Sequence, residues 1–198
     1  MSLKESNEIT VKIKCELEEF YKNIKEKGFK LVEEFSIDDT YLIPEKLNLE
    51  NTGIRDILSK AVIIREFESK PSGSIKRAIT FKIKRFDDVG NIISQEAINC
   101  SILEKEEARN LLKAIGYKEI MNIKEDDKIY EREDFKFAVK DIKNGDNLIE
   151  AETDENEELN TIEKLVKKIN EIEIPIYVDD YFVKKAEIEL GKILEKSN

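Results

Sequence analysis

Alternation of apolar and polar residues predicts that the chain consists largely of β-strands. Residues 8–14 read Glu-Ile-Thr-Val-Lys-Ile-Lys, which places Ile9, Val11 and Ile13 on one face and polar side chains on the other. Alternation or a high content of β-branched residues predicts further strands. These span residues 30–36, 40–43, 61–68, 75–84, 92–102, 118–124, 128–132, 135–142 and 148–153.

Apolar residues at helical spacing predict the remaining elements. Helices are expected over residues 15–27, 104–115, 155–171 and 180–194, with a short one around 54–58. Turns are expected at Asp38-Asp39, Pro71-Ser72-Gly73 and residues 87–91. These ten segments, which we count as about eight strands joined mostly by hairpins, predict an α+β fold. We expect an antiparallel eight-stranded closed or nearly closed β-barrel, a tunnel, with flanking helices.

Length and charge narrow the class of protein. The chain has 198 residues, 40% of them hydrophobic, which fits a single domain over residues 1–198. Its net charge of −10 argues against a nonspecific nucleic-acid binder, which needs a basic surface to release counterions. The chain has neither a signal-peptide pattern nor an apolar run of about 18 residues, so we expect a cytoplasmic protein without a membrane partner.

The chain contains no histidine, and this absence excludes whole classes of catalysis. A Ser-His-Asp triad, a Cys-His dyad and a His-ligated zinc site are impossible. Acid–base chemistry must come from Glu, Asp, Lys, Tyr or water activated by a metal. Cys15 and Cys100 are far apart in the sequence, and we expect small buried side chains there rather than a disulfide framework.

Charged side chains of opposite sign occupy different strands. Glu150 and Glu152 point the same way on one strand, where they repel unless water screens them or a hard cation such as Mg²⁺ or Mn²⁺ lies between them. Lys82 and Lys84 also share a strand face and suit a ligand with several phosphate charges. In both cases the alternative is an ordinary solvated strand face.

Taken in order, the motifs resemble the CYTH domain, the fold of class IV adenylate cyclases, thiamine triphosphatases and inorganic triphosphatases. The resemblance extends over residues 8–190 and rests on the order and spacing of short motifs. The segments that carry it are Glu8-Ile9-Thr10-Val11-Lys12, Gly28-Phe29, Asp39-Thr40-Tyr41-Leu42, Val62-Ile63-Ile64-Arg65, Thr80-Phe81-Lys82, Glu96, Ala114-Ile115-Gly116-Tyr117, Leu148-Ile149-Glu150-Ala151-Glu152 and Asp180-Tyr181.

The resemblance implies a tunnel in which acidic residues hold Mg²⁺ or Mn²⁺ and basic residues bind a small-molecule polyphosphate. The implied metal ligands are Glu8, Glu96, Glu150 and Glu152. The implied phosphate-binding residues are Lys12, Arg65 and Lys82, with Lys84 one step further along the same strand face. The implied catalytic residues are Glu8, Lys12 and Glu150.

The chain departs from the family pattern at several of these places. Thr10 replaces a second glutamate, Ile63 replaces an arginine, and residues 125–127 read Glu-Asp-Asp where the family has Lys-x-Arg. Two functions therefore stay open. One is metal-dependent hydrolysis of inorganic triphosphate, thiamine triphosphate or a nucleoside triphosphate, with adenylate cyclase activity as a lesser variant. The other is binding of an anionic ligand or partner without turnover.

The helix expected at residues 180–194 has two possible roles. Its apolar stripe could cap the barrel or pair with a second subunit in a homodimer.

Overall fold

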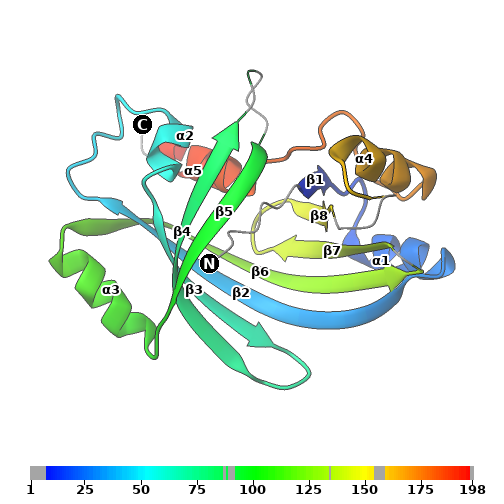
Figure 1. Cartoon of the computed structure of the whole chain (residues 1–198), viewed down its shortest axis with the longest axis horizontal. Coiled ribbons are helices and arrows are strands. Elements are labelled where there is room, and N and C mark those ends of the chain that lie inside the picture. Colours follow the sequence, from blue (N-terminus) through cyan, green and yellow to red (C-terminus); the bar gives the residue numbers. More distant parts are fainter. Residues whose placement is uncertain (1–7, 87, 89–91, 134, 154–158, 197–198) are drawn as a thin grey trace.

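The fold is built on one antiparallel sheet of eight strands that curls into a half-barrel (Figure 1). A computed structural model describes residues 8–86, 88, 92–133, 135–153 and 159–196. The strand order is β1-β8-β7-β6-β2-β3-β4-β5. The strands are β1 (Glu8–Lys12), β2 (Lys30–Pro44), β3 (Val62–Ser69), β4 (Ile75–Phe86), β5 (Ile92–Ser101), β6 (Tyr117–Arg132), β7 (Phe135–Ile142) and β8 (Asn147–Glu152). The predicted α+β fold and antiparallel tunnel are confirmed, although the sheet itself does not close.

The C-terminal part of the chain covers the open side of the sheet. The backbone N–H of Thr10 on β1 donates to the carbonyl of Tyr181, and that of Val183 donates to the carbonyl of Thr10. Helix α5 (Lys185–Lys196) follows and packs against α2 (Ile54–Leu58), with fully buried Leu190 in their shared core. This helix therefore caps the half-barrel of its own chain.

Two strands are longer than the sequence predicts. β2 runs unbroken through Asp38 and Asp39, so the predicted turn there is wrong, and β6 joins two predicted strands. A neighbouring strand and helix α3 (Lys105–Ala114) supply cationic partners for the two carboxylates. Arg65 donates to Asp39 through Nε at 2.7 Å and Nη2 at 2.6 Å, and Asp38 pairs with Lys105 at 2.9 Å. Tertiary pairing thus overrides the local turn preference of Asp-Asp.

The sheet turns its apolar face outward near β1 and its polar face inward. Ile9 and Val11 pack beneath α1 (Leu17–Glu26) and α4 (Ile162–Glu171) in the larger hydrophobic core. Glu8 and Thr10, which alternate with these residues on β1, therefore face the inside of the half-barrel. This arrangement gives the tunnel its charged lining.

The helices differ from prediction mainly at their ends. Helix α3 (Lys105–Ala114) lies where it was expected, whereas α4 begins at Ile162, after Thr161 accepts a hydrogen bond from the backbone N–H of Lys164. The expected turn at 87–91 lies almost wholly outside the described residues. None of the described helices is long and apolar enough to cross a membrane.

Candidate metal and phosphate site in the tunnel

The half-barrel encloses a cavity of about 600 Å³. Strands β1–β4 and β6–β8 line it, together with the two helices α2 and α5. Charged side chains of both signs face this space. They include Glu8, Glu33, Arg65, Lys82, Lys84, Glu125, Asp127, Lys140, Glu150, Glu152 and Lys185.

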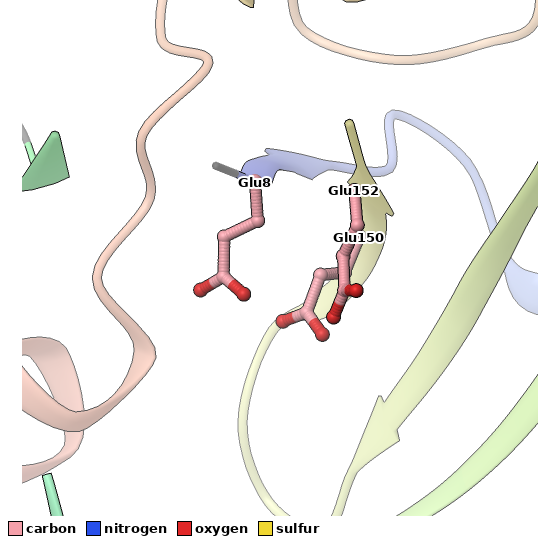
Figure 2. Close-up of side chains that lie close together, drawn as sticks. All are labelled: Glu8, Glu150 and Glu152. Carbon is pink, nitrogen blue, oxygen red and sulfur yellow. The ribbon is translucent and has the colours of Figure 1, made fainter. Parts of the chain in front are cut away.

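Three carboxylates converge at one side of the cavity (Figure 2). Glu8 on β1 pairs directly with Glu152 on β8, and Glu150 lies two residues earlier on the same face of β8. One oxygen from each side chain can be chosen so that all three lie within 4.8 Å of one another. Burial raises the pKa of Glu8, and the neighbouring charge of Glu150 raises it further. A cation between these groups would relieve that repulsion.

The geometry of the carboxylate trio fits a hard divalent cation. Mg²⁺ binds oxygen at about 2.0–2.1 Å in octahedral sites, so ligand oxygens on opposite sides of the ion are roughly 4.2 Å apart. Three ligands of one ion include at most one such opposite pair, and neighbouring ligand oxygens are roughly 3 Å apart. From the observed spacing of up to 4.8 Å, the three carboxylates would therefore have to move closer together around the ion. Thr10 pairs with Glu150 across the strands, so the position of the family's second glutamate holds a hydroxyl instead.

Two lysines from β4 line the same cavity. Lys82 and Lys84 both lower the pKa of Glu8, which places their charges close to the carboxylate trio. Burial, with the like charges of Arg65 and Lys84 nearby, lowers the pKa of Lys82 to about 8. Within the described part of the chain, neither lysine has a carboxylate within 4.0 Å. Both are therefore available to an anionic ligand.

Arg65 is more constrained than the two lysines. Its guanidinium lines the cavity but donates two hydrogen bonds to buried Asp39, whose side chain is only 1% exposed. Although burial opposes it, this pairing raises the pKa of Arg65. Arg65 is thus a fixed positive charge, held by two of its five N–H donors, and the other three remain for a ligand.

A buried ion network beside the carboxylate trio was not predicted from the sequence. Lys140 on β7 lies 2.9 Å from Asp127, 3.3 Å from Glu150 and 3.7 Å from Glu125. Lys185 on α5 lies 2.6 Å from Glu125. The alternation of β7 puts Lys140 on its inward face, which is the signal that could have revealed it.

Charge neutralisation in this network is uneven. Burial by itself would raise the pKa of Glu150 and of Glu125, but the surrounding lysines, Lys140 foremost, lower both. The negative charge of Asp127 is less well neutralised. Burial and the charge of Glu125 outweigh the effect of Lys140 and raise the pKa of Asp127 to about 6. The network therefore leaves Asp127 as the least stabilised carboxylate.

Two residues of the predicted site lie elsewhere. Glu96 pairs with Ile83 on β4, so it shares the face opposite to Lys82 and Lys84, and it lies 3.7 Å from Arg85. The prediction that Glu96 lies beside the carboxylate trio is therefore wrong, because its side chain is on the other face of the sheet. Lys12 is absent from the described cavity lining and pairs with Asp146 at 2.8 Å, so its phosphate-binding role stays a prediction.

Comparisons with known proteins agree with the fold. No protein-family profile matches the chain. The protein named "Putative adenylate cyclase MJ0240" from Methanocaldococcus jannaschii is 24% identical over 188 residues, which cover 92% of this chain and 98% of that protein. The solved structure of the PH1819 protein from Pyrococcus horikoshii has a TM-score of 0.66 at 20% identity, covering 94% of this chain and 99% of its own.

A second solved structure, described as a putative adenylate cyclase from Vibrio parahaemolyticus, has a TM-score of 0.57 at 15% identity. It covers 98% of this chain and 99% of that one. These similarities run over nearly the whole length of each protein. The two solved structures show the shared fold, and the relative named a putative adenylate cyclase agrees with the resemblance to the CYTH superfamily that the order of motifs indicates.

Proposed function

We propose that this protein catalyses a metal-dependent reaction of a small molecule that bears a triphosphate, and that the reaction is hydrolysis. One observation carries the proposal. Glu8, Glu150 and Glu152 converge in a tunnel that also presents Lys82 and Lys84 without carboxylate partners among the described residues. Acidic and basic groups so placed suit a divalent cation and a polyphosphate together.

The residues have separate tasks in this reaction. The carboxylate trio would hold Mg²⁺ or Mn²⁺, which neutralises negative charge on the transferred phosphoryl group. Lys82 and Lys84 bind and orient the phosphate chain, and Arg65 adds a fixed positive charge. In hydrolysis, a water oxygen forms a bond to the terminal phosphorus and loses a proton to solvent. The bond from that phosphorus to the bridging oxygen breaks, so the diphosphate part of the substrate leaves and orthophosphate is the other product.

A second candidate reaction is cyclisation of ATP. It is favoured by the name of the relative from Methanocaldococcus jannaschii, a putative adenylate cyclase. Here the ribose 3′-hydroxyl attacks the α-phosphorus and diphosphate leaves. Both reactions need the same metal and phosphate sites, so the products distinguish them.

The test is product analysis with three substrates. Inorganic triphosphate, ATP and thiamine triphosphate are each incubated with Mg²⁺, with Mn²⁺ and with EDTA, and orthophosphate and cyclic AMP are measured. We expect orthophosphate release that needs the metal and is abolished by Glu150→Gln. The matched control is Glu119→Gln, because Glu119 pairs with Arg109 and Lys113 and is absent from the described cavity lining.

Each other outcome has a definite meaning. Cyclic AMP with diphosphate would replace hydrolysis by the cyclase reaction. Release that persists in EDTA or in Glu150→Gln would refute the metal site. No product from any substrate, while ligands still raise the unfolding temperature, would leave a protein that binds without turnover.

A further inference from the structure

Lys82 lies in the tunnel without the counterion that a buried lysine normally has. Its side chain, on β4, lines the cavity and is only partly exposed. Among the described residues, no carboxylate lies within 4.0 Å of its amino group. Lysines that are withdrawn from water are usually paired, as Lys140 is with Asp127 at 2.9 Å. The unpaired position therefore favours the neutral amine over the ammonium ion.

The charges that face Lys82 are mainly positive. Arg65 lies on the neighbouring strand β3, and Lys84 lies two residues further along the same face of β4. Lys185 on α5 adds a third positive charge, and Glu8 on β1 opposes them. Burial and the like charges lower the pKa of Lys82 to about 8. At pH 8 roughly half of the molecules then carry a neutral amine, about 100-fold more than for an ordinary lysine.

Lys84 lines the same cavity but has different surroundings. Burial lowers its pKa too, but its side chain is exposed and the acidic residues Glu8 and Glu187 both favour its charged form. Glu150 on β8 faces both lysines, and Lys140 holds it at 3.3 Å. Of the two lysines, Lys82 is thus the one that combines a neutral amine with positively charged neighbours.

A neutral amine beside cations is the environment in which carbon dioxide adds to a lysine. The amine nitrogen forms a bond to the carbon, one carbon–oxygen π-electron pair moves onto oxygen, and the nitrogen loses a proton to solvent. The product is a carbamate, with one negative charge in place of a positive one. The ammonium form has no electron pair with which to react, and nearby positive charges stabilise the carbamate once it has formed.

We propose that Lys82 is a site of reversible modification by carbon dioxide. The cavity of about 600 Å³ admits so small a molecule. The carbamate oxygens would lie among the charges of Arg65, Lys84 and Lys185, and Arg65 has three N–H donors that Asp39 does not use. The modification changes the local charge by two units, so it should weaken binding of an anionic ligand. This last consequence rests on the proposed function, whereas the modification itself does not.

The test uses the full chain at pH 8 in EDTA with isotopically labelled bicarbonate, and carbon nuclear magnetic resonance detects the carbamate. The wild type should give a signal that is absent from Lys82→Arg, whose guanidinium stays charged. The signal of the α-amino group should remain in both proteins. Lys76→Arg is the matched control, because Lys76 is exposed, lies on the same face of β4 and is absent from the described cavity lining. Lys84→Gln, which removes a neighbouring cation, should lower the signal several-fold.

Chemical trapping locates the carbamate without any variant. A trialkyloxonium salt converts it into a stable ester, and mass spectrometry of the wild type should find the ester on Lys82 and not on Lys76. Circular dichroism establishes that the variants are folded. A wild-type spectrum with only the α-amino signal, an equal signal in Lys82→Arg, or equal trapping on both lysines would overturn the proposal. These measurements contain neither substrate nor metal, so their outcome is separate from that of the hydrolysis assay.

Calorimetric titration with inorganic triphosphate then measures the effect of the modification on binding. At constant ionic strength, bicarbonate should weaken the affinity of the wild type several-fold and leave that of Lys82→Arg unchanged. If the carbamate forms on Lys82 and the affinity of the wild type does not change, the modification site stands and the phosphate-binding role of Lys82 is refuted.

Discussion

Removal of the buried charge of Lys140 should destabilise the protein strongly. Its side chain is 8% exposed, and the side chains of its partners Asp127 and Glu125 are each 1% exposed. Glu150, also in contact with Lys140, is 26% exposed. In Lys140→Met the three carboxylates keep their negative charges, and only Lys185 remains within 4.0 Å of any of them among the described residues.

The size of the effect follows from the 2.9 Å contact between Lys140 and Asp127. At that distance the attraction is roughly 6 kcal/mol for an effective dielectric constant of about 20, before desolvation is subtracted. Breaking a buried pair by removing one partner typically costs about 3–5 kcal/mol. We expect a loss in this range from a total unfolding free energy of about 5–15 kcal/mol.

Urea unfolding at pH 8 measures this loss directly, with Lys136→Met as the matched control because Lys136 is an exposed residue on the same face of β7. The loss should shrink as the pH falls toward 5. The pKa of Asp127 is already raised to about 6, and without Lys140 its carboxyl is protonated more readily still. A loss below about 1 kcal/mol at pH 8, or one that grows on acidification, would refute the network as a stabilising feature.

Two further predictions concern the ligand groups. The pKa of Lys82 is about 8 in the free protein, so its side chain loses its positive charge, and the affinity for ATP should fall, between pH 7 and pH 9.5. Lys82→Arg stays charged over this range and should keep its affinity. An equal fall in both proteins would contradict this prediction. Thr10→Glu adds a carboxylate opposite Glu150, so Mn²⁺ should raise the unfolding temperature of this variant more than that of the wild type, and a smaller rise would contradict this placement.

The sequence was sufficient to locate the strand segments but not to give the full lengths of β2 and β6 or the pairing of the strands. The alternation at residues 8–12 and the shared face of Glu150 and Glu152 follow from local periodicity alone. The closeness of Glu8 to Glu152 depends on register between strands at opposite ends of the chain, and only the family resemblance indicated it. Local patterns could not show that β2 continues through Asp38-Asp39, because Lys105 and Arg65 neutralise those carboxylates from distant segments.

Local patterns could not predict the ion network around Lys140 either, because it joins residues from distant segments of the chain. Recognising residues 125–127 as part of one long strand would have placed Glu125 and Asp127 on its inward face, where buried carboxylates require cations. The sequence contains 34 lysines and arginines, and composition does not show which of these lie close to Glu125 and Asp127. The prediction for Glu96 is wrong for a related reason, because a shift of one residue in a strand decides which face of the sheet a side chain occupies.

The most direct test is equilibrium binding of Mn²⁺, followed by the electron paramagnetic resonance signal of the free ion. The wild type and the Glu119→Gln control should show the same saturable binding, and Glu8→Gln, Glu150→Gln and Glu152→Gln should each weaken it by roughly 10-fold or more. Circular dichroism establishes that all variants are folded. Equal Mn²⁺ binding by the wild type and all three glutamine variants would contradict a metal site at the carboxylate trio.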